Sequence, residues 1–295
     1  MISKITNIIS RQSEVVKHGS LYLGSRVGTK LLSFLMLPIW TIFLSPEQYG
    51  IIGLVIAYSG MSGVLILLGL PSAIVRQYHD YNEVWSGYIK TIFGYVLGVL
   101  FVVYVGMWTA NVILKDSAPD LIGRYRNIFW VSLLGGVVAQ LAIAGIQAER
   151  ASKQFIIGNF VSYLAGLSLS LLFVVCLDLG ASGFLYGMGF GSVTGVAYMV
   201  WNRRKTWLFG EGQIQLQFLK NGIKYGALLL PTALSGWAIN FFGRIILEGY
   251  NGLHEVGLFS FAGNLAVVMS FVMISLVQAW APEYYSIRKT GSADE

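Results

Sequence analysis

The sequence predicts an all-α fold, a polytopic transmembrane helix bundle, and three observations support this prediction. Of the 295 residues, 55% are hydrophobic and only 12% are charged, whereas soluble domains carry about 25% charged residues. The mean hydropathy is +0.66. The sequence also contains eight apolar stretches, each long enough to cross a bilayer, which takes about 20 residues.

The predicted spans follow one another in order, and charged or turn-forming residues separate them. They cover 20–44, 51–75, 91–113, 127–147, 155–177, 181–201, 225–247 and 257–281. Between the first and second spans, Ser45-Pro46-Glu47-Gln48 carries turn and charge signals. Only Asp178-Leu179-Gly180 separates the fifth from the sixth, which predicts a hairpin. In the seventh span, Pro231 predicts a bend.

Three further segments lie outside the spans. Residues 1–19 carry isoleucines at helical spacing between basic residues, which favours a helix in the membrane interface, with a frayed tail as the alternative. Residues 202–224 form a basic, half-apolar linker after the first six spans (20–201) and before the last two (225–281). This linker is typical of a segment held near anionic lipid or, alternatively, of a stop-transfer charge cluster. Residues 282–295 form a cytoplasmic tail.

Basic residues are distributed unequally between the two sides of the predicted spans. With the N-terminus inside, fourteen Lys and Arg lie in cytoplasmic segments and three in outer segments. The positive-inside rule therefore predicts a multi-pass protein with both termini in the cytoplasm. This asymmetry also explains the net charge of +6 without a nucleic-acid partner.

Arg26, Lys30 and Arg244 are the remaining three bases, and they lie inside predicted spans that contain no carboxylate. A charge at the centre of a lipid-facing helix costs roughly 2.5–3.5 kcal/mol, so such residues usually face a cavity or a partner. Because no acidic partner is available within the spans, we expect an anionic substrate. The alternative is that these long side chains reach the headgroup layer by snorkelling.

Polar neighbours extend the two basic sites. Arg26 and Lys30 are four residues apart and therefore share one helix face, to which Tyr22 also belongs. Asn240 precedes Arg244 by four residues and is expected on the same face. The predicted substrate-binding residues are therefore Tyr22, Arg26, Lys30, Asn240 and Arg244.

Signs of catalysis or of a bound metal are lacking in the sequence. It has one cysteine, Cys176, and three widely separated histidines, without metal-ligand spacing. It contains no phosphate-binding loop, and its loops are too short to supply an acid, a base and a metal together. We therefore expect no cofactor, no metal site and no enzymatic activity.

Two regions carry distinctive motifs. The first is "LYLGSRVGTKLLSFLMLPIWTIFLSPEQYG" from Leu21 with "GLPSAIVRQY" from Gly69; the second starts at Tyr225-Gly226 and runs through "PTALSGWAINFFGRIIL" to "QAWAPEYYS" at Gln278 to Ser286. Both regions resemble the bacterial oligosaccharide flippases, polysaccharide biosynthesis proteins of the O-antigen type. The broad superfamily also includes multidrug and toxin extrusion antiporters. The resemblance implies two six-helix lobes around a cavity.

The resemblance also implies a function. Such proteins lie in the bacterial cytoplasmic (inner) membrane and move an undecaprenyl-diphosphate-linked oligosaccharide across it by alternating access. The implied partners are the lipid-linked glycan, the bilayer and other polysaccharide assembly proteins. Basic residues in the first and seventh spans are typical of the cavity in relatives, and they map onto Arg26, Lys30 and Arg244. Many relatives carry an acidic residue immediately before the seventh-span arginine, where this chain has Gly243.

Relatives also continue for four or more spans beyond the eighth. We therefore expect a truncated chain with one six-helix lobe and the first two helices of a second lobe; a short form that dimerises is the alternative. Two rival functions stay open. A cation-coupled multidrug exporter would need a membrane carboxylate, and a non-transporting scaffold in polysaccharide assembly would tolerate replacement of Arg26 and Lys30.

Overall fold

The structure is a computed structural model that describes residues 24, 27–114, 123 and 125–266. These residues form helices joined by short connections, and none of them lies in a β-strand. Five of the described helices are long and apolar enough to cross a membrane, and Val27–Phe43 is a shorter apolar helix. The predicted all-α, polytopic helix bundle is thereby confirmed. Tyr22, Arg26 and the predicted segments 1–19 and 282–295 lie outside the described residues.

The helices follow the order of the predicted spans. Their bounds are α2 (Leu37–Phe43), α3 (Pro46–Leu67), α4 (Leu70–Gln77), η1 (Asn82–Val84), α5 (Trp85–Leu114), α6 (Arg126–Ala148), α7 (Ser152–Leu171), η3 (Leu172–Cys176), α8 (Gly180–Asn202), α9 (Arg204–Trp207), α10 (Leu216–Trp237) and η4 (Ala238–Phe242). Both η3 and η4 are π-helical turns. After η4 the chain remains helical to Ala266.

Local sequence explains where the first two long helices begin and end. The helical turns before α2 are interrupted at Met36, two residues before Pro38, which lacks the N–H that a helix interior requires. Ser45 and Gln48 form a capping box at the start of α3. The helix ends at Leu68 and Gly69, which both have positive φ angles, 46° and 74°. These two residues turn the chain from α3 into α4.

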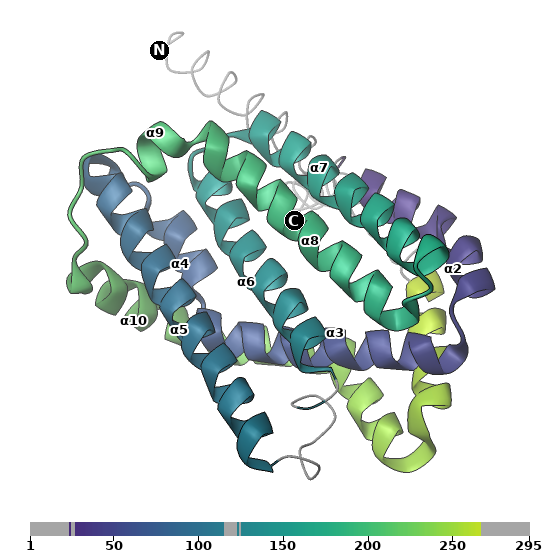
Figure 1. Cartoon of the computed structure of the whole chain (residues 1–295). Helices are drawn as coiled ribbons and strands as arrows, with labels where there is room; N and C mark the ends of the chain where they lie inside the picture. Colours follow the sequence, from purple (N-terminus) through teal and green to yellow (C-terminus); the bar gives the residue numbers. More distant parts are fainter. Residues whose placement is uncertain (1–23, 25–26, 115–122, 124, 267–295) are drawn as a thin grey trace, which may run out of the picture.

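Glycine allows the closest contacts of the bundle, between α7 and α8. A Cβ atom at Gly191 of α8 would overlap the backbone of Gly166 in α7, and one at Gly187 would overlap Ser170. Small residues at four-residue spacing bring membrane helices together in this way. In Figure 1, α8 lies between α6 and α7, and α3 crosses near the far ends of these helices.

Helix α10 and its continuation, which correspond to the seventh predicted span, run along α3 in the opposite direction. Gly226 of α10 contacts the backbone at Gly69, and the indole Nε1 of Trp237 donates a hydrogen bond to the carbonyl oxygen of Ala57 at 2.8 Å. Farther along, Gly53 lies close to both Arg244 and Ser260. The chain therefore reverses between these two residues, around Gly252 with its φ angle of 77°. Figure 1 shows this reversal as two adjoining arms at the lower right.

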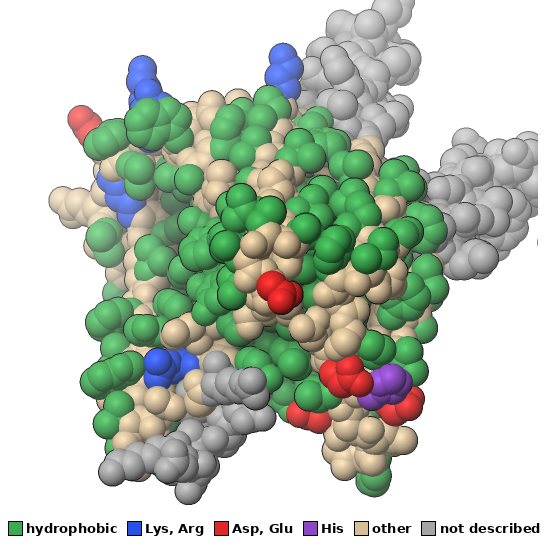
Figure 2. Space-filling model, turned by 45° about the vertical axis from the view of Figure 1, so that its right-hand side comes forward, with side chains coloured by type: hydrophobic (Ala, Val, Ile, Leu, Met, Phe, Trp, Pro, Cys, Tyr) green, Lys and Arg blue, Asp and Glu red, His purple; other side chains and the backbone are tan. Residues whose placement is uncertain are grey.

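Hydrophobic side chains cover most of the face in Figure 2, and Lys and Arg lie toward its margins. Many large apolar residues are exposed, among them Phe101, Val102 and Ile113 of α5. An exposed apolar surface of this extent is expected where lipid is the solvent. The described part of the chain is thus a multi-pass membrane helix bundle.

Candidate functional site

A cavity of about 190 Å³ opens between the helix Val27–Phe43, α3, α7, α8 and the two helical arms on either side of Gly252. Its lining residues are Lys30, Leu31, Ser33, Phe34, Leu37, Trp40, Tyr49, Ile52, Gly53, Ile56, Tyr163, Leu167, Phe184, Met188, Arg244, Ser260 and Asn264. Aromatic and aliphatic side chains make up most of this surface, with a few polar groups between them. Such a composition is typical of a ligand-binding pocket. We name this space the basic cavity.

Lys30 and Arg244 are the two charged residues of the basic cavity. Lys30 is exposed and comes from the first helix, whereas Arg244 is half-buried and follows η4. Residues from the first and the seventh predicted spans are therefore brought to one place. This arrangement favours a cavity-facing role for both bases over separate snorkelling.

The guanidinium of Arg244 is held by packing rather than by a counter-charge. Its Cζ atom lies 5.0 Å from the ring centre of Phe241, within the range of a cation–π contact. Its Nε atom is buried without a hydrogen-bond partner, and so is the hydroxyl of Ser260, another lining residue. Buried polar atoms normally have partners. Both groups can donate a hydrogen bond at the wall of the basic cavity.

The charge in the basic cavity is uncompensated within the described residues. Two ion pairs form among the described residues, Arg203 with Glu149 and His254 with Glu47. Neither pair involves Lys30 or Arg244. Glu248, one turn after Arg244, accepts a hydrogen bond from the hydroxyl of Tyr58 instead. The lining therefore carries two positive charges without a carboxylate. Such a site attracts anions.

The other three predicted binding residues are not among the described lining residues of the basic cavity. Tyr22 and Arg26 lie outside the described residues. Asn240 is not among the lining residues, and its amide donates to the carbonyl oxygen of Gly236 at 2.8 Å. The place of Asn240 beside Arg244 in a binding site stays a prediction. Asn240 lies within the π-helical turn Ala238–Phe242, and Arg244 follows this turn.

Sequence reasoning missed several lining residues, in particular Trp40, Tyr49, Tyr163 and Ser260. They are uncharged residues in or beside apolar stretches, and Trp40 and Tyr49 also belong to a buried cluster with α8. Their sequence context does not distinguish a cavity wall from ordinary helix packing. Only the tertiary arrangement identifies them.

A second charged cluster joins the linker to the ends of α5 and α6. The carboxylate of Glu149 accepts hydrogen bonds from the indole N–H groups of Trp85 at 2.7 Å and Trp207 at 2.5 Å. Arg203 Nε lies 3.0 Å from the second oxygen of Glu149, whose side chain is only 7% exposed. These contacts hold the carboxylate in place and connect α9 to the bundle. The cluster is a structural joint away from the basic cavity.

Comparisons with known proteins agree with this architecture. A solved structure designated "protein A" matches with a TM-score of 0.57 and 18% sequence identity, over 90% of this chain and 64% of that one. At this identity the likeness concerns the fold alone, and the chain spans about 64% of that structure's length. A comparison with curated proteins gave no significant match. The profile of the family described as "Polysaccharide biosynthesis protein" matches residues 15–285. The chain therefore belongs to the polysaccharide biosynthesis protein family.

Proposed function

We propose that the protein is a flippase that moves an undecaprenyl-diphosphate-linked oligosaccharide across the bacterial cytoplasmic membrane by alternating access. Membership of the polysaccharide biosynthesis protein family supports a role in polysaccharide assembly. The single observation that carries the finer proposal is the joint presence of Lys30 and Arg244 in one cavity without a carboxylate.

A diphosphate suits the two bases. The guanidinium of Arg244 matches phosphate oxygens with paired N–H donors, whereas the ammonium of Lys30 acts as a flexible point charge. Hydrogen bonds that involve charged partners are roughly twice as strong as neutral ones. The unbonded Nε of Arg244 and the hydroxyl of Ser260 add donors at the same wall. In this proposal the diphosphate lies in the basic cavity while the polyprenyl chain stays in lipid.

The same observation disfavours a cation-coupled multidrug exporter. Exchange of a cation normally requires a membrane-embedded acidic group, and the described lining of the basic cavity contains only basic charge. A positively charged drug would also be repelled by Lys30 and Arg244. An anionic substrate avoids both difficulties.

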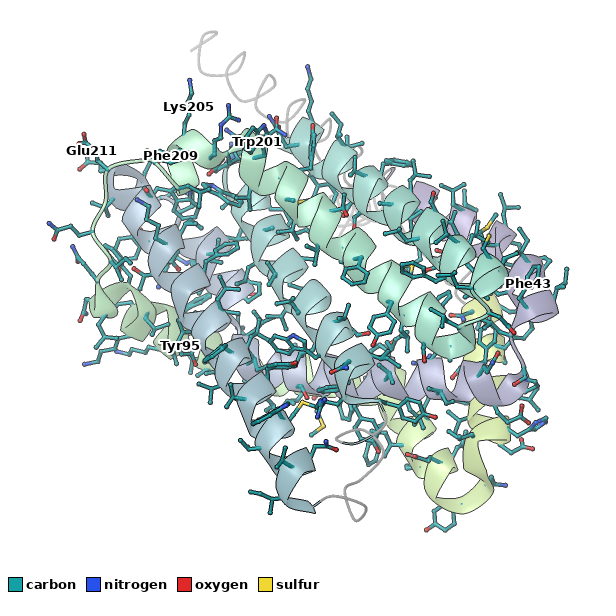
Figure 3. All side chains as sticks on the ribbon, viewed as in Figure 1. Phe43, Tyr95, Trp201, Lys205, Phe209 and Glu211 are labelled. Carbon is teal, nitrogen blue, oxygen red and sulfur yellow. The ribbon has the colours of Figure 1, made fainter. Side chains whose placement is uncertain are left out.

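We place the linker end of the bundle in the cytoplasm. Trp201, Lys205, Phe209 and Glu211 project from this end in Figure 3, and Phe43 lies at the opposite end. The basic residues in the described segments assigned to the inside are Arg76, Lys90, Arg150, Lys153, Arg203, Arg204, Lys205, Lys220 and Lys224. Lys90 Nζ donates to the carbonyl oxygen of Gly210 at 2.8 Å, which holds the linker against α5. The positive-inside rule then puts the N-terminus in the cytoplasm as well.

The test is restoration of surface glycan in a strain that lacks the gene. We expect Lys30→Gln and Arg244→Gln each to reduce surface glycan by about tenfold or more, because each removes a charge-assisted contact to phosphate. The matched control is Lys205→Gln, which removes an exposed charge at the linker end. Full restoration by both cavity variants, at normal protein levels, would contradict the proposal.

A further inference from the structure

A second, larger cavity adjoins the basic cavity. Its volume is about 560 Å³, and it lies between α3, α6, α8 and the C-terminal part of α10 with η4. Its lining residues are Ile56, Ser59, Gly60, Gly63, Val64, Ser132, Leu133, Gly136, Val137, Gln140, Phe184, Leu185, Met188, Gly189, Ser192, Ala233, Gly236, Trp237 and Phe241. Ile56, Phe184 and Met188 line both spaces, so the two are neighbours. We name it the neutral chamber.

The chemistry of the neutral chamber differs from that of the basic cavity. None of its lining residues is charged. Serine hydroxyls and the amide of Gln140 supply hydrogen-bond donors and acceptors. Aromatic rings of Phe184, Trp237 and Phe241 supply flat apolar surfaces. A sugar ring offers the complement of both, with hydroxyl groups around its edge and C–H groups on its faces.

Trp237 is held in place at the wall of the neutral chamber. Its indole N–H donates to the carbonyl oxygen of Ala57 in α3 at 2.8 Å, and its ring packs against Phe242 with 6.2 Å between ring centres. A ring fixed in this way presents a rigid surface at little further loss of conformational freedom. The π-helical turn η4 follows directly and separates Trp237 from Arg244.

Glycine keeps the neutral chamber open on two walls. A Cβ atom at Gly136 of α6 or Gly236 of α10 would meet no atom within 4 Å. A methyl group at either position would therefore meet no neighbouring atom, and both positions line the chamber. The chamber is not a close helix contact of the kind that Gly191 makes with Gly166, where a Cβ would overlap backbone.

We infer that the neutral chamber binds the first sugars of the lipid-linked glycan while the basic cavity holds its diphosphate. The inference rests on the proposed function and assigns the uncharged polar and aromatic residues of α6, α8 and α10 to a carbohydrate subsite. The order of the two spaces matches the order of the groups in the substrate, because the sugars are bonded directly to the diphosphate.

The test compares two probes on the purified protein in lipid nanodiscs. One probe is undecaprenyl diphosphate, and the other is lipid-linked oligosaccharide extracted from the native host. The wild-type protein should bind the glycosylated probe about tenfold or more tightly than the bare diphosphate, the gain expected from several added hydrogen bonds and ring contacts. Gly136→Leu and Gly236→Leu should abolish this difference and leave binding of the bare diphosphate unchanged.

The control variant is Gly98→Leu in α5, where a Cβ atom likewise meets nothing within 4 Å but which lines neither space. It should bind both probes as the wild-type protein does. The variant Gln140→Met, which keeps the size of the side chain and removes its amide, should lose part of the preference for the glycosylated probe.

The outcomes separate the inference from the proposed function. Equal binding of both probes by the wild-type protein overturns the carbohydrate subsite and leaves the diphosphate site standing. If Gly136→Leu and Gly236→Leu weaken binding of both probes equally, the carbohydrate subsite is also overturned. The same holds if these variants keep the wild-type preference for the glycosylated probe. Failure of the wild-type protein to bind either probe overturns the inference together with the proposed function.

Discussion

Arg244 and Ser260 meet α3 at the same residue, Gly53, and each brings an unbonded polar atom to the basic cavity. A Cβ atom built on Gly53 would lie 3.4 Å from Cδ of Arg244 and would overlap the hydroxyl of Ser260. Nε of Arg244 and Oγ of Ser260 are buried without hydrogen-bond partners. The absence of a side chain at Gly53 is therefore what allows both helical arms to approach α3 here.

This relationship predicts that Gly53→Ala damages the site although alanine favours helices. Alanine stabilises a helix interior by about 1 kcal/mol relative to glycine, whereas overpacking a tight contact costs about 1–3 kcal/mol. We expect a net loss of thermal stability and weaker binding of undecaprenyl diphosphate. The matched control is Gly98→Ala, at a position with free space around the new methyl group. Equal stability and binding of the two variants would refute the close contact at Gly53.

Lys30 and Arg244 should act on the same ligand group. A contact between a charged donor and phosphate contributes about 1.5–3 kcal/mol, so Lys30→Gln and Arg244→Gln should each weaken binding of undecaprenyl diphosphate by about 10- to 150-fold. Because both contact one diphosphate, their effects should not add. A double-mutant cycle measured by equilibrium binding in nanodiscs checks this coupling. Strict additivity would mean that the two bases bind separate groups.

Glu149→Gln should loosen the joint between the linker and the bundle. The substitution keeps one acceptor oxygen for an indole N–H but removes the charge that pairs with Arg203. Hydrogen bonds to charged groups contribute about 1.5–3 kcal/mol, and we expect a stability loss of that order. Thermal unfolding of the purified protein measures it, and Glu211→Gln, at an exposed linker position, serves as the control. Unchanged stability would show that the carboxylate charge is dispensable.

The proposed orientation predicts which loops are reached from outside the cell. In a Cys176→Ser background, a cysteine at Asp178 should react with a membrane-impermeant maleimide in intact cells, because this loop joins the outer ends of α7 and α8. A cysteine at Glu211, in the linker, should react only after the membrane is permeabilised. The opposite labelling pattern would contradict the proposed orientation.

Much of the fold could be predicted from the sequence because lipid restricts the choices. Backbone groups in a bilayer must be paired within the segment, so long apolar stretches become helices. Turn signals were equally informative: Ser45 and Gln48 cap α3, and Gly180, with a φ angle of 52°, begins α8. Charge alone identified Lys30 and Arg244 as candidate site residues, because a basic residue inside an apolar span is costly and therefore rare.

The walls of both cavities could not be predicted in the same way. Serine, glycine and tryptophan are common in membrane helices, so nothing in the sequence distinguishes Ser260, Gly136 and Trp237. Their roles depend on which helix faces them. Asn240 illustrates the limit, because it lies within a π-helical turn that leaves no clear mark in the sequence. Likewise, the pairing of Arg244 with Gly53 depends on a chain reversal around Gly252.

The most direct measurement compares the affinities of the purified protein for undecaprenyl diphosphate and for undecaprenol, the same lipid without phosphates. If the basic cavity binds the diphosphate, the wild-type protein should prefer the phosphorylated lipid by about 100-fold, and Arg244→Gln should remove most of that preference. Equal affinity of the wild-type protein for the two lipids would contradict the account.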